Sequence, residues 1–435
     1  MIIAKNTIIP SVDDTLGILT MYNHEMPQYV DFDKVMMYIG HLQMEIKKVS
    51  GPLFNTIGKP VKTDASGNMK YWLSDKADLT VFETTKTGIS LEKESIASAI
   101  ESGKLSEEVI SVLNQYSEYA NLAHTRSTLV SLLQNPIAKE PSYDGHRMLV
   151  LRPEWAGQNT GRVAMRKPAI QNFPRNIQDI QTVPRGFVYC HTDSGQIEPR
   201  ETYSFFIPDP QIQTLIRLYN DAYYGLLHYC TMPEEDIINK RMNFEKMEIT
   251  PELKEMRQKI KTYGNAVMYG SKSNPTGDPI KAAMIKRIGE HPLRVAKVNE
   301  YRERIRRGER IFHTYFGTPI DITKSPKIAG GKYESVEEQF LKLAINNPIQ
   351  GTAADLMRYS VQQANRIIML ESPKSSIINY VHDAGSFAIY EDDFDKVKDK
   401  LGNIVSYEVE DWLPIYAEPE FGRANGEHGI FKDYY

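Results

Sequence analysis

The sequence has few cysteines and no long apolar run. Its 435 residues include two cysteines, Cys190 and Cys230, which are too few for a disulfide framework or for a zinc site made of cysteine alone. No stretch approaches the roughly 18 consecutive apolar residues of a membrane-spanning helix. The N-terminus does not have the pattern of a signal peptide, because acidic residues soon follow its short apolar stretch. We therefore expect an intracellular protein of a reducing compartment that makes no use of a membrane.

The net charge is also small, at −4, and a charge of this size taken alone disfavours a nucleic-acid binder. The charge is unevenly distributed, however. Residues 240–310 contain 18 lysines and arginines against 9 acidic residues, and much of the compensating acid lies near residues 391–399. Such a segment fits either a nucleic-acid surface or ordinary solvated helix faces.

Composition is that of a globular protein, with 41% hydrophobic and 25% charged residues. Periodicity predicts an α+β fold in which helices and a broken sheet alternate along the chain. We expect an extended arm over 1–27 and a helix over 29–49, then helices within 91–133 and strands at 148–155 and 186–192. Helices follow over 210–310, broken at 231–236 and 273–279, and two strands lie within 375–390.

The segment YCHTDSGQIEPRETY, residues 189–203, joins a strand to a helix. The strand is predicted to end at Asp193, and a turn through Ser194 and Gly195 leads into a helix that carries Gln196 and Glu198. A carboxylate held rigidly at a strand end suits a hard cation such as Mg²⁺. A plainer interpretation is that Asp193 caps the helix N-terminus.

The segment MRQKIKTYGNAVMYGSKS, residues 256–273, repeats polar side chains every four residues. Arg257, Lys261, Asn265 and Tyr269 would share one stripe of a helix. Two cations and a phenol on one face could bind a triphosphate and a sugar. An exposed basic helix with Tyr269 packed at its edge explains the same pattern.

The segment NYVHDAGSF places His382 and Asp383 in a tight turn between two apolar strands. A buried aspartate there needs a metal ion or a cation, whereas a plain hairpin turn would more often end in Asp-Gly. Two further segments carry polar side chains: 344–361 begins with amides and continues as a small-residue helix, and 159–176 includes Arg162, Gln171 and Asn172.

In their order and spacing these five segments resemble the family A DNA polymerases, the polymerase I family. TDSGQIEPR is similar to the family's motif A, DYSQIELR; RQKIKTYGNAVMYG is similar to motif B; and VHDAG is similar to motif C, VHDE. NPIQGTAADLM, and TGR followed by QNFP, are similar to two further family segments. The resemblance covers most of the chain. It implies a right-hand fold with an antiparallel palm sheet and helical fingers and thumb.

The same resemblance divides the chain into five parts. It implies an N-terminal arm at 1–25, a thumb at 26–145, a palm in two parts at 146–215 and 336–435, and fingers at 216–335. The chain would be a divergent stand-alone polymerase unit of phage or mobile-element type, without a 3′–5′ exonuclease domain. It would work in the cytoplasm, that of the host cell if it is viral.

The implied activity is template-directed addition of dNTPs to a primer 3′-hydroxyl by two-metal phosphoryl transfer. Asp193, Asp383 and the Ser194 carbonyl would hold two Mg²⁺ ions, with Mn²⁺ as a substitute. Lys261 would protonate the leaving pyrophosphate, and Glu198 would leave no room for a 2′-hydroxyl. The implied nucleotide-binding residues are Arg257, Lys261, Asn265, Tyr269, Gln196 and Glu198. The implied contacts to primer–template DNA are Arg162, Gln171, Asn172, Lys342, Asn346, Gln350 and His382.

Four positions depart from the family pattern. Asn265 stands where motif B has an aromatic residue, and Ala384 stands where motif C has a glutamate. Asp221-Ala222-Tyr223 lacks the family's phosphate-binding histidine, and Lys342 replaces an arginine and with it a bidentate geometry. These departures put base stacking, sugar discrimination and primer positioning in question.

Two alternatives remain open. A phage-type single-subunit RNA polymerase shares the palm and the His-Asp turn, but the run Gln196-Ile197-Glu198 and the lack of a promoter-binding N-terminal domain argue against it. A non-catalytic primer–template-binding relative would be expected to have lost a metal carboxylate, yet Asp193 and Asp383 are both present. Beyond DNA and dNTPs, a separate exonuclease, helicase or processivity factor would be a partner on another chain.

Overall fold

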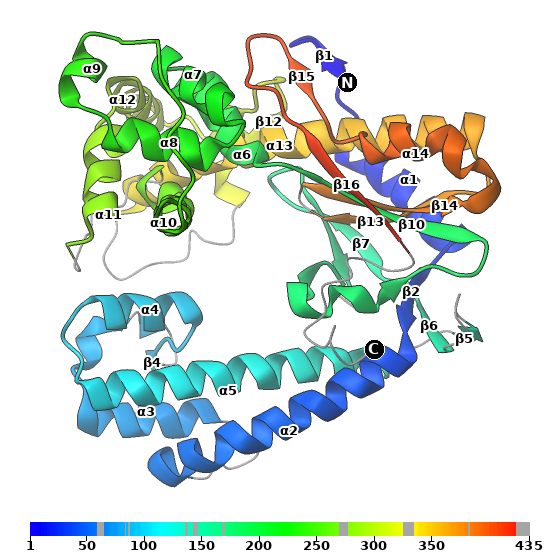
Figure 1. Cartoon of the computed structure of the whole chain (residues 1–435), viewed down its shortest axis with the longest axis horizontal. Coiled ribbons are helices and arrows are strands. Elements are labelled where there is room, and N and C mark those ends of the chain that lie inside the picture. Colours follow the sequence, from blue (N-terminus) through cyan, green and yellow to red (C-terminus); the bar gives the residue numbers. More distant parts are fainter. Residues whose placement is uncertain are drawn as a thin grey trace.

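The computed structural model describes residues 1–58, 65–82, 84–85, 88–134, 138–141, 147–167, 170–268, 277–324, 335–381 and 383–422. Figure 1 shows three regions, which we call the central sheet, the lower helical lobe built on α2 and α5, and the upper helical lobe that contains α7 to α12. Within the described ranges, every helix is too short or too polar to span a lipid bilayer.

The central sheet is antiparallel, with strand order β13–β14–β10–β16. Its strands are β10 (Phe187–Ser194), β13 (Ser376–Val381), β14 (Ala384–Tyr390) and β16 (Ala417–Gly422). Because side chains alternate along a strand, one face buries Cys190 and Phe387 in a core shared with three helices: α1 (Val12–Glu25), α13 (Val336–Glu371) and α14 (Phe394–Gly402). The other face of β10 carries His191 and Asp193, which are less buried.

The lower helical lobe packs two long helices, α2 (Phe32–Ile57) and α5 (Glu107–Leu132), against each other. Its tip holds α3 (Ala65–Lys76), α4 (Lys93–Glu101), β3 (Thr84–Thr85) and β4 (Gly88–Ile89). A second sheet of order β5–β6–β2–β9 lies at its base, formed by β2 (Gln28–Asp31), β5 (Ala138–Pro141), β6 (Arg147–Leu151) and β9 (Gln181–Thr182). The hairpin β7 (Glu154–Gly157) and β8 (Val163–Arg166) follows β6.

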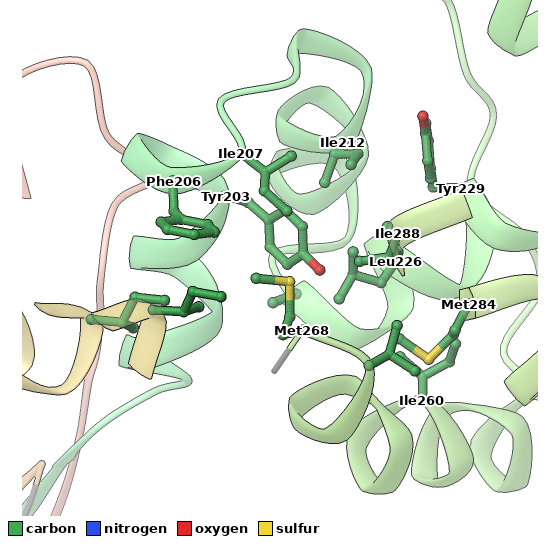
Figure 2. Close-up of a cluster of buried hydrophobic side chains, with 14 of the residues drawn as sticks. Tyr203, Phe206, Ile207, Ile212, Leu226, Tyr229, Ile260, Met268, Met284 and Ile288 are labelled. Atoms are coloured by element: carbon green, nitrogen blue, oxygen red, sulfur yellow. The ribbon is translucent and has the colours of Figure 1, made fainter. Parts of the chain in front are cut away.

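The upper helical lobe has its own apolar core. Figure 2 shows Tyr203, Leu226, Ile260 and Met284 directed toward one another in this core, with Phe206 to one side of them. Its helices are α7 (Pro210–Tyr219), α8 (Ala222–Thr231), α9 (Glu234–Ile238), α10 (Pro251–Met268), α11 (Pro279–Met284) and α12 (Pro292–Arg306). The short helix α6 (Ile197–Glu201) and a π-helical turn, Thr202–Phe206, connect the central sheet to this lobe.

Two small pairings complete the fold. Strand β1 (Ile2–Ile3) pairs in parallel with β15 (Glu408–Val409). The hairpin β11 (Ile311–His313) and β12 (Pro319–Asp321) packs against α13. A Cβ atom at Gly351 of α13 would lie 2.5 Å from the Ile320 side chain of this hairpin. The close packing of α13 on the hairpin therefore requires glycine at position 351.

The structure corrects four expectations about secondary structure. The extended arm predicted over 1–27 is wrong, because Ser11 and Asp14 form a capping box that starts α1. The helix predicted over 29–49 begins only at Phe32, after strand β2, and runs to Ile57. The strand predicted over 148–155 is interrupted between β6 and β7, and residues 239–250 within the predicted helical stretch are not helical.

A buried ion pair on α13 ties several segments together. Asp355 accepts hydrogen bonds at 2.6 and 3.0 Å from two threonine hydroxyls in the turn between β11 and β12, and it pairs with Arg358. Arg358 also donates to the carbonyls of Pro10 and Gly161, at 2.9 and 2.8 Å. Gly161 has φ +78°, and a Cβ atom there would lie 2.2 Å from the Arg358 guanidinium. The pair therefore positions the loop that carries Arg162.

Replacing Arg358 with methionine should destabilise the fold strongly. The change leaves Asp355 charged and buried without its cation, which typically costs about 3–5 kcal/mol. Urea unfolding at neutral pH measures the loss. The control is Arg306→Met, which removes an arginine whose side chain is 54% exposed and should cost less than about 1 kcal/mol. Equal losses in the two variants would contradict the role assigned to Arg358.

Candidate active site

The central sheet brings Asp193 and Asp383 together. Strands β10 and β14 pair so that Asp193 lies opposite Ala384, the residue after Asp383. The Ser194 amide donates to the Asp383 carbonyl at 2.9 Å. The two aspartates, 190 positions apart in the sequence, therefore lie on adjacent strand ends, and both are partly exposed.

Asp193 is not the cap of the following helix. Gln196 occupies the N-cap position of α6, in a left-handed conformation with φ +58°, and makes no side-chain cap. The Gly195 amide donates to the Tyr416 carbonyl at 2.9 Å and thereby fixes the turn. The plainer interpretation of Asp193 as a helix cap is therefore wrong.

Asp221, at the N-cap of α8, links the turn after β10 to α10. Its carboxylate pairs with Arg257, whose Nη2 lies 2.6 Å away, and accepts a 2.8 Å hydrogen bond from the Gln196 side chain. The Gln196 oxygen in turn accepts from the Ala222 amide at 2.6 Å. Burial acts to raise the pKa of Asp221, but the hydrogen bonds from Arg257, the Tyr224 amide and Gln196 outweigh it and the pKa is lowered. Nothing in the sequence indicated this role: Asp221 stood out only as part of the run Asp221-Ala222-Tyr223, which lacks the family's histidine.

Arg257 and Lys261 lie beside the aromatic rings of α8. The Arg257 guanidinium is 5.2 Å from the ring centres of both Tyr223 and Tyr224, and Lys261 Nζ is 6.0 Å from that of Tyr223. Arg257 is partly buried, whereas Lys261 is exposed. The helical stripe predicted from the sequence thus exists as far as α10 is described.

The loop after Gly161 reaches α6, where Arg162 pairs with Glu198. The two side chains are 17% and 23% exposed, so the pair is largely shielded from water. One turn further along α6, Glu201 is fully buried. Among the described residues, neither of its carboxylate oxygens has a hydrogen-bond partner. Burial, together with the nearby charge of Glu198, raises the pKa of Glu201 well above its ordinary value.

The residues expected to contact DNA fall into two groups. Lys342, Asn346 and Gln350 recur every four residues and share one stripe of α13. The Asn346 side-chain oxygen is buried, with no hydrogen-bond partner in the described part of the chain. Gln171, by contrast, uses its amide within the protein, because it accepts from the Met165 amide at 2.7 Å and donates to the Tyr380 carbonyl.

Four of the predicted site residues remain outside this description. Tyr269 and His382 do not belong to the described residues, and the side chains of Asn172 and Asn265 are not described. The sequence analysis missed Glu418, which lies directly opposite Asp193 on β16. Its position depends on strand pairing over more than 200 residues, so no local pattern indicates it.

The donor atoms at the strand ends suit a hard cation. Carboxylate and carbonyl oxygens are the usual ligands of Mg²⁺, and Asp193, Asp383 and the Ser194 carbonyl supply them on adjacent strands. Within the described residues, no group of three or more His, Cys, Asp or Glu side chains is arranged to hold a metal ion. A metal at this site would therefore depend on the two aspartates, the Ser194 carbonyl and oxygens from a bound substrate or water.

The chain is similar in sequence to known DNA polymerases. The family model described as DNA polymerase family A matches residues 33–427. DNA polymerase I of Caldicellulosiruptor bescii is 25% identical over 399 residues, covering 89% of this chain and 43% of the relative. The thermostable DNA polymerase I of Thermus filiformis is 22% identical, covering 88% of this chain and 44% of its own length. The chain thus spans less than half the length of these relatives.

A solved structure shares the fold. The POL domain of Pol1 from M. smegmatis, in complex with DNA primer-template and dNTP, superposes with a TM-score of 0.71 at 19% identity. The match covers 95% of this chain and 69% of that one. The α+β right-hand fold expected from the sequence is therefore confirmed.

Replacing Asp221 with asparagine should lower stability in a pH-dependent way. Asparagine keeps the capping oxygen but loses the charge that holds Arg257, and hydrogen bonds to charged groups contribute about 1.5–3 kcal/mol. Because the folded pKa of Asp221 lies below the ordinary value of 3.8, its contribution is present above that value. It is lost as the pH falls through the lower folded pKa.

Urea unfolding near pH 7 and near pH 3 tests this expectation. The difference between wild type and Asp221→Asn should be large at neutral pH and should shrink in acid. As a control, Asp236→Asn removes the ion pair with Arg241, whose side chain is 53% exposed, and should change stability little at either pH. A difference for Asp221→Asn that does not vary with pH would contradict the electrostatic account.

Proposed function

The chain belongs to DNA polymerase family A, and from this premise we propose that it adds dNTPs to a primer 3′-hydroxyl under the direction of a DNA template. The observation that carries the proposal is the pairing of β10 with β14, which sets Asp193 beside Asp383 at one end of the central sheet. The names of the relatives, and the primer-template and dNTP in the M. smegmatis complex, support the same substrates.

The regions of the fold take roles consistent with this activity. The central sheet would be the palm, the upper helical lobe the fingers, and the lower helical lobe the thumb. In Figure 1 the two lobes lie on either side of the end of the sheet that carries the paired aspartates. Primer–template DNA would lie between the lobes, with the primer end at Asp193 and Asp383.

The two aspartates and the Ser194 carbonyl would hold two Mg²⁺ ions, which supply Lewis-acid activation of the primer hydroxyl and neutralise charge on the leaving pyrophosphate. The chain's own contribution is position. Asp193 is fixed in a central strand by hydrogen-bonded neighbours on both sides, and Asp383 is fixed through the hydrogen bond from the Ser194 amide. Carboxylates held in this way need little reorganisation when they bind a cation.

Arg257 and Lys261 would bind the nucleotide's phosphates. Asp221 engages the Nε and Nη2 of Arg257, which leaves the other edge of the guanidinium able to donate to phosphate, since this group carries five N–H donors. Lys261 is exposed on the same helix and would donate a proton to the departing pyrophosphate. Asp221 would therefore orient Arg257, and the two could stay paired while Arg257 binds phosphate.

Glu198 would discriminate between sugars. From its place on α6, one turn after β10, its carboxylate would face the ribose of the incoming nucleotide. Asn265 of α10, together with Tyr269 outside the described residues, would complete the sugar and base contacts. Steric exclusion with a desolvation penalty can contribute several kcal/mol to discrimination. The stripe of Lys342, Asn346 and Gln350, with Arg162, would contact the minor groove, where shared acceptors permit binding without reading sequence.

Primer extension on a DNA template, with separate dNTP and rNTP pools, tests the proposal. We expect extension with dNTPs and Mg²⁺ and none with a chelator. Preferential use of rNTPs would favour the RNA polymerase alternative. DNA binding without any extension would favour the non-catalytic alternative.

Asp193→Asn and Asp383→Asn should each abolish extension while leaving the fold and DNA binding intact. Each change removes a carboxylate charge from the cation site. Single-turnover incorporation at saturating Mg²⁺ is the measurement, with binding followed by fluorescence anisotropy. The control, Asp395→Asn, alters an aspartate whose side chain is 90% exposed on α14 and should keep wild-type activity. More than about a tenth of wild-type activity in either active-site variant would overturn the assignment.

Glu198→Ala should relax sugar selection. The ratio of kcat/KM for dNTP over rNTP is expected to fall by about 100-fold or more, mostly through faster rNTP use. Steady-state kinetics with one matched dNTP and rNTP pair give this ratio. Glu154→Gln, at an exposed ion pair with Lys167, serves as the control. If Glu198→Ala leaves the ratio unchanged, Glu198 does not select the sugar.

A further inference from the structure

Glu201 is a buried acid for which the proposed mechanism has no use. It is fully buried on α6, and both of its carboxylate oxygens lack a hydrogen-bond partner among the described residues. Buried polar groups are nearly always hydrogen-bonded, and an unpaired one needs an explanation. A carboxyl group in this position is costly to keep unless another state of the molecule satisfies it.

Arg162 is the cation placed to satisfy it. Glu198 and Glu201 are three residues apart on α6, so their side chains are neighbours on one face of the helix. Arg162 pairs with Glu198 through Nη2, while its Nε is buried and, like Glu201, has no partner in the described part of the chain. The positive charge of Arg162 acts on Glu201 and opposes the effect of its burial. The ion pair of Arg162 with Glu198 thus leaves a buried donor on Arg162, and Glu201, three residues along α6, has acceptors that also lack a partner among the described residues.

We propose that Glu201 is a positioning residue that takes over Arg162 when Glu198 turns to the incoming nucleotide. The inference rests on the proposed function, because only a nucleotide in the site gives Glu198 a second partner. Without Glu201, the departure of Glu198 would leave a largely buried guanidinium unpaired, which is unfavourable. With it, Arg162 keeps a carboxyl partner and stays beside the primer end. Arginine suits such an exchange because its donors are spread around a planar fork.

A double-mutant cycle in the free chain tests this proposal without DNA or nucleotide. The four proteins are wild type, Glu198→Ala, Glu201→Gln and the double variant, compared by thermal unfolding. In wild type, Glu201 is not paired, so the isosteric Glu201→Gln should move the Tm by less than about 1 °C. In the Glu198→Ala background, Arg162 depends on Glu201, so the same change should lower the Tm by about 3 °C or more.

For a second variant, Glu201→Leu, the expected Tm shift differs in sign between the two backgrounds. Glu201→Leu replaces an unpaired buried acid with an apolar side chain, so it should raise the Tm or leave it unchanged in wild type. In the Glu198→Ala background it should lower the Tm, because Arg162 then has neither carboxylate. Glu154→Gln should shift the Tm equally in both backgrounds. Equal shifts for Glu201→Gln and Glu201→Leu in the two backgrounds would overturn the proposal.

Kinetics separate a positioning role from a merely structural one. In primer extension, Glu201→Gln should raise the KM for dNTP about fivefold and change kcat less than twofold, because it weakens the nucleotide-bound arrangement and leaves the chemical step intact. An unchanged KM would overturn the role in nucleotide binding. If the wild-type chain did not extend primers, the proposed function would fail, and the unfolding cycle would still decide whether Arg162 exchanges partners.

Discussion

The pairing of β10 with β14 is the constraint on which the rest of the site depends. It joins β10, which carries Asp193 next to its last residue, to β14, which begins just after Asp383. Because side chains alternate along a strand, a slip of one residue would turn Asp193 into the core and bring Thr192 to the open face. Cys190 and Phe387 lie opposite each other on the buried face of the sheet, and their packing against α13 and α14 holds the register. Packing on one face of the sheet thus fixes the chemistry on the other.

Three arginine–carboxylate pairs extend this arrangement outward from the sheet. Arg358 and Asp355 fix the loop at Gly161, Arg162 and Glu198 join that loop to α6, and Arg257 and Asp221 join α10 to the turn after β10. Each pair, directly or through its further hydrogen bonds, connects segments that are remote in the sequence. Each is shielded from water, where a lost partner costs more than the pair contributes when intact. In the proposed function, the arginines that would bind phosphate and primer are therefore held in place before a substrate arrives.

Much of this site could be predicted from the sequence, because its motifs combine local strand and turn patterns with a recognisable order. Strand β10 with Asp193, strand β13 before the His-Asp turn and the helix carrying Arg257 lie where periodicity and turn chemistry indicate them. Helix α1 was missed because its signal is a single capping box in a weakly amphipathic segment. Glu418 and the partnership of Asp221 with Arg257 were missed for another reason. They arise from contacts between distant segments, and no window of sequence contains both partners.

The central claim is that Asp193 and Asp383 together hold two divalent cations. Its most direct test is electron paramagnetic resonance of Mn²⁺ in a complex of the chain with a dideoxy-terminated primer–template and a non-hydrolysable dNTP analogue. The account predicts a spin-coupled pair of ions in wild type, and its loss in Asp193→Asn with the DNA still bound. A spectrum of isolated Mn²⁺ that is the same in both proteins would contradict it.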